Sequence, residues 1–247
     1  MKLSIVTVCY NAAATITDTI TSVRQQQHEP IEYIVVDGKS TDGTVQVIRA
    51  NESKIDRWIS EPDKGIYDAM NKGIAMATGD VVGILNSDDF YSSHDVINQV
   101  MKEFEDPAVD AVFGDLVFVD PGNLTRVVRK YSAKNWTPKK LAWGFMPPHP
   151  TFFVRRKFYG SLGLYKTDYR ISSDYELIIR FLLVNKLRYK YLPLQMVTMR
   201  KGGVSSRNMK SNFILNEEII RACRENGVFT NRLMVYSKYF KKVTELF

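Results

Sequence analysis

The stretch Leu3-Ser-Ile-Val-Thr-Val-Cys-Tyr-Asn11 begins with a run rich in β-branched residues and ends on polar ones. Such a run predicts a buried strand. Residues 12–26 follow with Ile16, Ile20 and Val23 at helical spacing, so a helix should come directly after the strand. A strand followed by a helix is the repeating unit of sheets whose strands run parallel.

The same alternation continues through the first half of the chain. Further strands are predicted at residues 31–36, 57–60 and 81–85, and further helices at residues 45–50, 66–77 and 94–101. This alternation predicts an α/β fold with a mixed, mainly parallel sheet that helices cover on both faces.

The pattern changes beyond Asp106-Pro107. Two extended segments, at residues 111–119 and 124–131, flank the turn residues 120–123, which predicts a β-ribbon or a mixed sheet edge. Later strands are expected at residues 151–154 and 189–194, and later helices at residues 156–162, 174–184, 211–224 and 232–246. No linker is long enough to separate independent domains, so a single domain is expected.

Charge is divided unevenly along the chain. Residues 1–120 carry 9 basic and 20 acidic side chains, whereas residues 121–247 carry 25 basic and 7 acidic ones. Cys9 and Cys223 are the only cysteines, which excludes a disulfide framework and favours a cytoplasmic location. The apolar run at the N-terminus is too short for a signal peptide, and no stretch approaches the roughly 20 apolar residues of a membrane span.

Polar residues follow four of the predicted strands. These polar residues are 7–11, Asp37, Asp63-Lys64 and 86–89. Ligands of open α/β sheets bind beyond the carboxyl ends of the strands. Carboxylates gathered at that edge repel one another unless a cation is bound among them. Asp88 and Asp89 could both contact one Mg²⁺ or Mn²⁺, although a turn and helix cap before residues 94–101 is an alternative for such a pair.

Several short motifs follow one another along the chain. They are Thr7-Val-Cys-Tyr-Asn11, Val36-Asp37 with Ser40-Thr-Asp-Gly-Thr44, Asp63-Lys-Gly-Ile-Tyr-Asp-Ala-Met-Asn-Lys-Gly73, Ala77-Thr-Gly-Asp80, Leu85-Asn-Ser-Asp-Asp89, His149-Pro-Thr-Phe-Phe153, Ser173-Asp-Tyr-Glu176 and Gly202-Gly-Val-Ser205. In this order the motifs resemble those of family 2 glycosyltransferases, which have the Rossmann-like GT-A fold. The resemblance leaves only the residues beyond 205 without a motif, and it implies a nucleotide-sugar donor.

A donor site is implied by the resemblance. The main chain around Thr7, Cys9, Tyr10 and Asn11 would line the base and ribose pocket. Asp37 would accept a hydrogen bond from the base, typically the N3–H of uracil. For Asp37 the alternative is a turn residue before Gly38.

The diphosphate side of that site is implied in the same way. The residues that would lie along the ribose and diphosphate are Lys64, Asp68, Asn71 and Asn86. For Lys64 a plain solvated lysine is the alternative.

A metal site is implied by the family's Asp-x-Asp motif. The matching residues are Asn86 and Asp88, so one carboxylate of the motif is an amide in this chain. Asp88 would bind Mn²⁺ or Mg²⁺, Asp89 would share it, and His149 would lie near the metal and the acceptor. A structural role for His149 is equally open.

The catalytic base implied by the resemblance is Asp174, which would take the proton of the acceptor hydroxyl. One displacement with one base implies inversion at the anomeric carbon. The alternative is a capping box, because Ser173 and Glu176 have the spacing of one. Residues 202–205, flanked by Arg200, Lys201 and Arg207, would close over the diphosphate or form a basic surface turn.

The basic half of the chain suggests an anionic partner. Residues 231–247 place apolar side chains at helical intervals beside lysines, which suits an anionic bilayer surface or a helix packed on the domain. Many relatives transfer to polyprenyl-diphosphate-linked saccharides, which would bring the enzyme to the inner face of the cell membrane. The expected division is residues 1–120 for the donor, 121–205 for the glycan or lipid-linked acceptor, and 206–247 as a basic helical segment.

Two other functions are compatible with parts of the sequence. A sugar-nucleotidyltransferase can share the general fold, but the glycine-rich phosphate loop expected of it is missing between Thr7 and Thr15. A protein that binds nucleic acids or other anions could use the basic half. The acidic first half and the lack of any nucleic-acid-binding motif argue against a nucleic-acid partner.

Overall fold

The computed structural model describes the backbone of residues 1–202 and 209–244, and the side chains of residues 1–202 and 211–239. Its strands are β1 (Leu3–Cys9), β2 (Ile31–Asp37), β3 (Arg57–Ser60), β4 (Val81–Ile84), β5 (Phe90–Tyr91), β6 (Ala111–Asp120), β7 (Asn123–Tyr131), β8 (Phe153–Arg155) and β9 (Tyr189–Arg200). Its α-helices are α1 (Ile16–Arg24), α2 (Thr44–Ala50), α3 (Ile66–Met76), α4 (Val96–Glu103), α5 (Lys157–Leu162), α6 (Ser173–Ile178), α7 (Met209–Glu225) and α8 (Arg232–Thr244). Short 3₁₀ helices lie at Glu52–Lys54, Pro138–Trp143 and His149–Thr151, and a π-helical turn, Ile179–Val184, continues α6.

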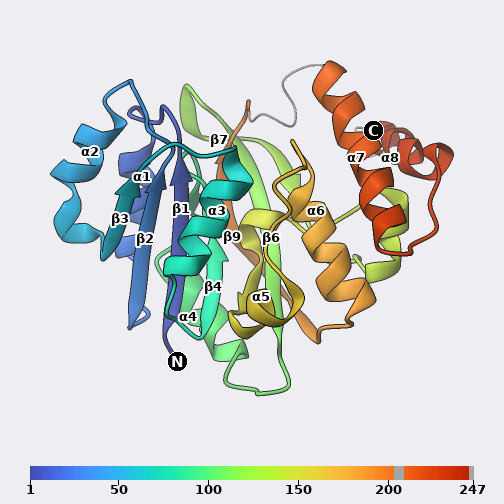
Figure 1. Cartoon of the computed structure of the whole chain (residues 1–247), viewed down its shortest axis with the longest axis horizontal. Coiled ribbons are helices and arrows are strands. Elements are labelled where there is room, and N and C mark those ends of the chain that lie inside the picture. The colour runs from blue at the N-terminus through green and yellow to red at the C-terminus, as the bar shows by residue number, and fades with distance from the viewer. Residues whose placement is uncertain (203–208, 245–247) are drawn as a thin grey trace.

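The strands of the described residues form one mixed sheet in the order β3-β2-β1-β4-β8-β6-β9-β5, with β7 paired to β6. Strands β3, β2, β1 and β4 are parallel to one another. β8 runs antiparallel to β4 and to β6, and β6 and β9 are again parallel. The predicted α/β fold is therefore confirmed, with its parallel half formed by the first half of the chain (Figure 1).

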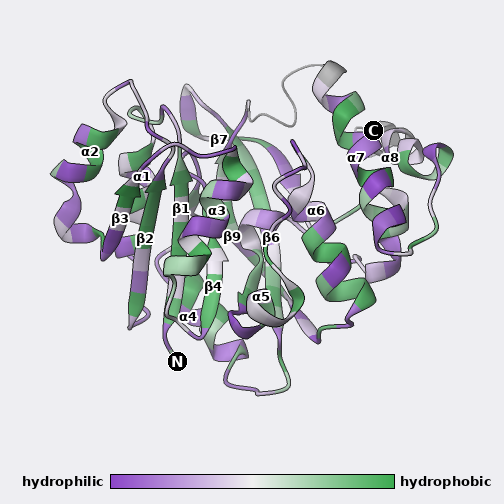
Figure 2. Ribbon diagram, in the orientation of Figure 1, coloured by the Kyte–Doolittle hydropathy of each residue, from purple (hydrophilic) through white to green (hydrophobic). Residues whose placement is uncertain are grey.

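Two apolar clusters cover the faces of the sheet, whose strands are largely hydrophobic (Figure 2). Because side chains alternate along a strand, Leu3 and Ile5 pack with residues of α1 and α4, whereas Val6 and Val8 pack with residues of α3. Gly73 allows α3 to lie close to β1, since a Cβ at this position would come within 2.2 Å of a Val6 methyl. Helices α7 and α8 lie at the end of the molecule opposite α2 (Figure 1).

Three predicted elements differ from the structure. The strand expected at residues 151–154 begins only at Phe153, because Pro150 has no N–H for a ladder and lies in a 3₁₀ turn. The strand expected at 189–194 continues to Arg200, since β6 pairs with it over that length. The helix expected at 174–184 changes to a π-helical turn at Ile179.

Candidate active site

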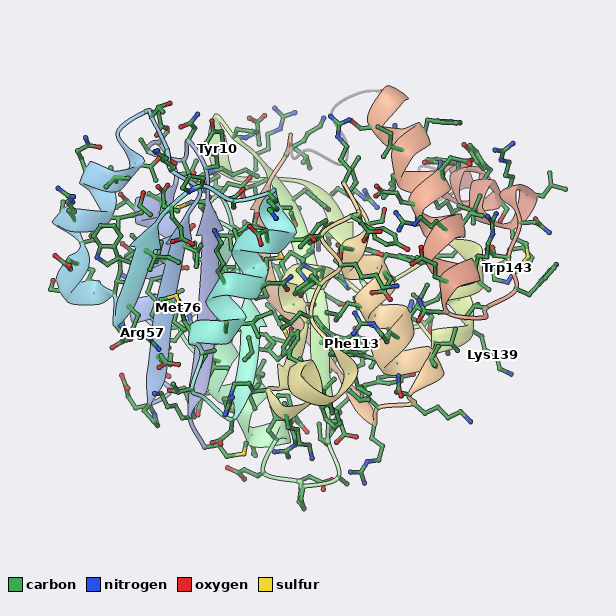
Figure 3. All side chains as sticks on the ribbon, in the orientation of Figure 1. Tyr10, Arg57, Met76, Phe113, Lys139 and Trp143 are labelled. Atoms are coloured by element: carbon green, nitrogen blue, oxygen red, sulfur yellow. The ribbon has the colours of Figure 1, made fainter. Side chains whose placement is uncertain are left out.

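The carboxyl ends of the four parallel strands meet at one edge of the sheet, which is the upper edge in Figure 1. Tyr10 follows β1 and is labelled at this edge in Figure 3. Its side chain is 65% exposed. Thr7 and Cys9 lie in the strand itself and their side chains are buried.

The two buried side chains of β1 are engaged inside the sheet. Thr7 Oγ1 accepts a hydrogen bond of 3.0 Å from the Tyr33 hydroxyl. The Cys9 thiol lies 3.6 Å from Val36 O and from Asp37 Oδ1. Burial, and then the charge of Asp37, raise the pKa of the Cys9 thiol well above its ordinary value. Only main-chain atoms of Thr7 and Cys9 therefore remain for a ligand, as the motif implies.

The loop after β2 is held by its own side chains. Asp37 is fully buried, and its Oδ2 accepts hydrogen bonds from Ser40 N at 3.0 Å and Ser60 Oγ at 2.6 Å. Its Oδ1 accepts a hydrogen bond of 2.5 Å from Ser40 Oγ and also faces the Cys9 thiol. Asp37 thus fulfils the alternative role of a turn residue, and a hydrogen bond to a base would require one of these donors to leave.

Asn11 joins the loops that follow β1 and β2. Its backbone lies in the left-handed region, with φ of 52°. Its side-chain oxygen accepts a hydrogen bond of 2.9 Å from Thr41 N, and its own N–H donates to Ser40 Oγ at 2.8 Å. Asn11 therefore holds the loop that carries Tyr10 against the loop after β2.

Three predicted ligand residues lie at or near the start of α3. Lys64 is exposed, and its N–H donates to Asp68 Oδ2 at 3.0 Å. Asp68 also lies 3.7 Å from the Lys72 ammonium. The amide of Asn71 exchanges two hydrogen bonds, of 2.8 and 3.0 Å, with the main chain of Tyr165. Asn71 is thus engaged in holding the Tyr165 segment.

The loop after β4 has more acceptors than donors. The Asn86 amide donates to Asp89 Oδ2 at 3.3 Å, which leaves Asn86 Oδ1 and Asp89 Oδ1 buried without a partner among the described residues. Burial raises the pKa of the Asp88 carboxyl. Burial, and then the charge of Asp88, raise that of Asp89 well above its ordinary value. Arg200 approaches the loop, donating to Asp88 O at 2.6 Å, and its charge acts in the opposite direction on both carboxyls.

These oxygens fit a hard divalent cation. Mg²⁺ and Mn²⁺ take oxygen ligands, and Mg²⁺ is usually held by one or two protein carboxylates together with substrate phosphates. No three His, Cys, Asp or Glu side chains of the described ranges are grouped as a complete metal site. The fit is therefore to a cation shared with a diphosphate, with Asn86, Asp88 and Asp89 as its protein side.

Asp174 lies in the first turn of α6 beside α3. Its Oδ1 accepts a hydrogen bond of 2.8 Å from Tyr175 N and lies 3.3 Å from the Tyr67 hydroxyl. Its Oδ2 has no hydrogen-bond partner among the described residues, and burial raises the pKa of the carboxyl. A partly buried carboxylate with one free oxygen is a suitable general base.

His149 belongs to the surroundings of Asp174. Its Nε2 lies 2.7 Å from the Tyr165 hydroxyl, and the imidazole and the Asp174 carboxyl influence each other's pKa. Burial lowers the pKa of His149 although the charge of Asp174 acts in the opposite direction, and the lowered pKa favours the neutral ring. Its hydrogen bond to Tyr165 fits the structural alternative, and no contact joins it to Asp88 or Asp89.

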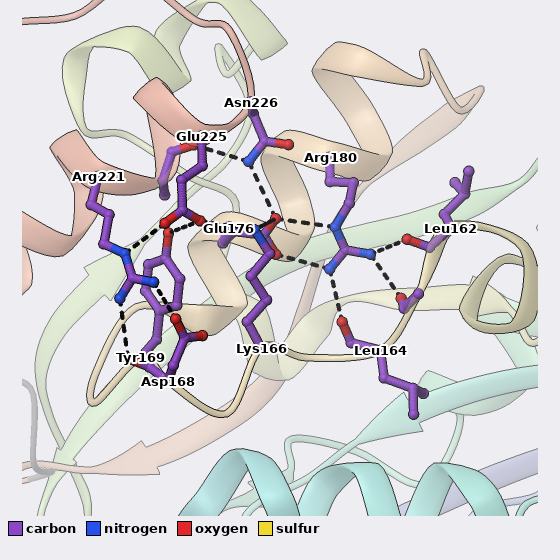
Figure 4. Close-up of polar contacts among 12 residues, drawn as sticks. Leu162, Leu164, Lys166, Asp168, Tyr169, Glu176, Arg180, Arg221, Glu225 and Asn226 are labelled. Carbon is purple, nitrogen blue, oxygen red and sulfur yellow. Dashed lines mark hydrogen bonds and ion pairs between the residues drawn. The ribbon is translucent and has the colours of Figure 1, made fainter.

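The capping box considered for Ser173 and Glu176 is wrong. Ser173 Oγ is buried without a partner among the described residues, and the N-cap of α6 is Ser172. The fully buried Glu176 instead accepts hydrogen bonds from Arg180 at 2.8 Å and from Asn226 at 3.2 Å (Figure 4). Burial opposes its ionisation, but Arg180, Asn226 and Lys166 together outweigh burial and lower its pKa.

The segment before Asp174 is held from the C-terminal part of the chain. The Glu218 carboxylate of α7 accepts hydrogen bonds from three consecutive main-chain N–H groups, those of Arg170, Ile171 and Ser172, at 2.7 to 2.9 Å. Sequence patterns gave no sign of this contact, because Glu218 lies 46 to 48 positions from the three N–H groups, on a helix without a motif. The predicted loop at 202–205, with Arg207, lies outside the described residues beyond position 202.

The helix predicted at residues 232–246 is present as α8, and Val235 and Lys238 are buried against the 3₁₀ helix Pro138–Trp143. Leu233, on another face, is 85% exposed. The side chains of Phe240, Val243 and Phe247 lie outside the described residues. No helix in the described part of the chain is long and apolar enough to cross a membrane.

The chain is similar to known glycosyltransferases over most of its length. Residues 4–165 match the family model described as Glycosyl transferase family 2. An uncharacterized glycosyltransferase of Mycobacterium tuberculosis is 34% identical over 190 residues, which are 74% of this chain and 69% of the relative. A PGL/p-HBAD biosynthesis glycosyltransferase of Mycobacterium bovis is 27% identical over 85% of this chain and 82% of its own.

Solved structures share the fold at lower identity. S. aureus TarS 1-349 in complex with UDP-GlcNAc has a TM-score of 0.68 and 19% identity, over 90% of this chain and 66% of the other. The mannosyltransferase PcManGT from Pyrobaculum calidifontis, in complex with GDP-Man and Mn²⁺, has a TM-score of 0.67 and 20% identity, over 90% and 63%. The chain spans 40% of the length of a longer TarS structure.

Proposed function

Because the chain belongs to glycosyl transferase family 2, we propose that it transfers a hexosyl or N-acetylhexosaminyl group from a UDP-sugar to a hydroxyl of a glycan or lipid-linked saccharide. Polysaccharide biosynthesis is the process that such a reaction would serve. The observation that carries the proposal is the state of the loop after β4, where two buried oxygens have no partner among the described residues. No observation favours the two alternatives, a sugar-nucleotidyltransferase and a nucleic-acid-binding protein, over a family 2 glycosyltransferase.

In the proposed mechanism Asp174 accepts the proton of the acceptor hydroxyl. Its free Oδ2 would face the acceptor while Tyr175 N holds Oδ1; the single proton of the nearby Tyr67 hydroxyl is directed to Ile171 O at 2.5 Å. Asn86, Asp88 and Asp89 would hold Mn²⁺ or Mg²⁺, which when bound supplies positive charge to the leaving diphosphate. A single displacement with this one base inverts the anomeric carbon.

The two halves of the domain have separate proposed roles. Residues 1–120 would bind the donor with Tyr10, the main chain around Asn11, and Lys64. Residues 121–205 would bind the acceptor, and residues 206–247 would extend that surface. Asp174 and His149 come from the second part, whereas Tyr67 beside Asp174 comes from the first, so the reaction would take place where the two meet.

We further propose that the enzyme works in the cytoplasm and contacts the inner face of the cell membrane. Trp143, Phe229 and Leu233 are 46, 79 and 85% exposed. Thr230 Oγ1 donates to Ala142 O at 2.6 Å. This hydrogen bond joins the segment that carries Phe229 to the one that carries Trp143. Trp143 and Lys139 are labelled at this end of the molecule in Figure 3, far from Tyr10. Apolar side chains beside lysines suit an anionic bilayer.

The donor is tested by calorimetric titration of the protein with UDP, GDP and dTDP, each with and without Mn²⁺. Binding of UDP that depends on Mn²⁺ and exceeds that of the other two supports the proposal. Absence of binding to all three would overturn it. A radiolabelled sugar assay with UDP-glucose, UDP-galactose and UDP-N-acetylglucosamine would then identify the transferred group.

A further inference from the structure

Asp37 does not have a free oxygen for a nucleobase. Both its oxygens lie at full burial, and three N–H or O–H donors and one thiol surround them. Ser40 and Ser60 donate three hydrogen bonds to the group, and the single Cys9 proton is shared between it and Val36 O. Full burial keeps a base from any lone pair that remains. Another group at the same edge must therefore recognise the base if the donor is a UDP-sugar.

Gly38, the next residue, marks where that group lies. A Cβ built on Gly38 would be 2.3 Å from Asp63 Oδ2, closer than any real contact. The backbone of Gly38 is outside the left-handed region, so its conformation alone would accept a side chain. The Asp63 carboxylate therefore excludes any side chain at residue 38, because it occupies the position of the Cβ atom.

The Asp63 carboxylate has one oxygen held and one free. Oδ1 accepts a hydrogen bond of 2.8 Å from Gly65 N, which fixes the orientation of the group. Oδ2 accepts no hydrogen bond from the described residues, and the side chain is only partly buried. An oriented carboxylate with an accessible free oxygen can accept a single N–H from a ligand.

An exposed aromatic ring stands beside this oxygen. Tyr10 Cδ2 lies 3.5 Å from the same Gly38 Cβ position, and the Tyr10 side chain is 65% exposed. Base stacking on an aromatic face is favourable for any nucleobase and does not distinguish among them. The pair thus combines a stacking surface with one selective acceptor.

We propose that Asp63 Oδ2, and not Asp37, accepts the N3–H of uracil while the base lies against Tyr10. The proposal rests on the proposed function, because it assigns the base contact of that same donor site. Uracil N3 carries a hydrogen and donates, whereas cytosine N3 is an acceptor that a carboxylate repels. Asp63 would therefore make the site prefer UDP to CDP.

The test is calorimetric titration of the full chain with UDP and with CDP in the presence of Mn²⁺. The wild type should bind UDP at least tenfold more tightly than CDP. Asp63→Asn keeps an oxygen for Gly65 N but can offer either end of an amide, so UDP affinity should fall about tenfold and the preference should disappear. Asp37→Asn should leave the UDP/CDP ratio of the folded protein unchanged.

A relocation of the carboxylate provides a positive test. Asp63→Ala removes the group that blocks residue 38, and adding Gly38→Asp to it should restore the preference for UDP over CDP. Failure of the wild type to bind either nucleotide would overturn the proposed function and this inference together. Normal UDP binding with an unchanged ratio in Asp63→Asn would overturn the inference alone.

Discussion

The loops after β2 and after β4 end parallel strands at the same edge of the sheet and both carry a fully buried aspartate, yet they are in opposite states. Around Asp37 every acceptor meets a donor of the protein. Around Asp89 two oxygens meet none among the described residues, and the carboxyl pKa is raised. Satisfied acceptors stabilise a fold, whereas unsatisfied ones raise its free energy until a ligand supplies positive charge. We propose that the loop after β2 is a scaffold and that the loop after β4 is prepared for a ligand.

We expect the largest effect at Asp174, whose free oxygen is proposed to take the proton of the acceptor. Asp174→Asn removes the base but retains its shape, so kcat should fall by about 10³-fold while UDP affinity stays within about twofold of the wild type. Turnover is measured by release of UDP and affinity by calorimetry. Near-normal turnover would show that the free oxygen of Asp174 has no part in proton transfer.

The scaffold loop should respond in stability. Asp37→Ala would remove the buried acceptor of three hydrogen bonds from Ser40 and Ser60, and at about 1 kcal/mol for each bond we expect the free energy of unfolding in urea to fall by about 3 kcal/mol. The matched variant Ser60→Ala removes one donor and should cost only about 1 kcal/mol. Equal costs for the two would mean that Asp37 is not the centre of the loop.

The prepared loop should respond in the opposite way. Asp89→Asn removes a buried charge, so in metal-free buffer the free energy of unfolding should be unchanged or about 1 kcal/mol higher. Stabilisation by Mn²⁺ with UDP, seen as a rise in melting temperature, should be lost. Asp120→Asn, at an exposed turn, changes the net charge equally and should retain that rise. Destabilisation of metal-free Asp89→Asn would remove the contrast between the two loops.

The dependence of rate on pH gives a smaller and more specific test. Burial raises the pKa of Asp174, so this carboxyl keeps its proton to a higher pH than an ordinary aspartate, whose value is 3.8. The base is therefore lost as pH falls through the raised pKa, and kcat should decline there about tenfold per pH unit. A decline that begins only near the ordinary value would contradict the assignment.

The membrane contact should show the smallest change. Phe229→Ser together with Leu233→Ser should reduce sedimentation with phosphatidylglycerol vesicles several-fold, with little effect on phosphatidylcholine vesicles. Phe213→Ser is the control, since Phe213 is 58% exposed near the other end of α7. An equal reduction for Phe213→Ser would contradict a membrane contact located at Phe229 and Leu233.

Sequence patterns predicted the parallel half of the fold closely. Apolar runs rich in β-branched residues in β1 and β2, which are buried along their whole length, and helical spacing in α1 and α3 record which residues each element buries. The 3₁₀ helix His149–Thr151 was missed because prolines interrupted an otherwise strand-like run. The length of β9 was missed because its partner β6, distant in sequence, determines where it ends.

The candidate site was predicted unevenly for the same reason. Asp88, Asp89 and Asp174 were identified through motifs, and their roles stay predictions. The occupied state of Asp37 depends on Ser60, and the position of Asp63 depends on Gly38, and neither contact has a signal within one segment. Contacts between loops that follow different strands arise only when the sheet is assembled.

The grip of Glu218 on the three N–H groups before Asp174 bears on how this enzyme could be altered by exchange of its parts. The C-terminal segment lies beyond residues 4–165, which match the family model, and so invites grafting as if it were a replaceable attachment. In this chain the graft would also have to supply the carboxylate that holds the main chain of residues 170–172. Because we propose Asp174 as the base, we expect that a new acceptor specificity must be selected together with the geometry of proton transfer.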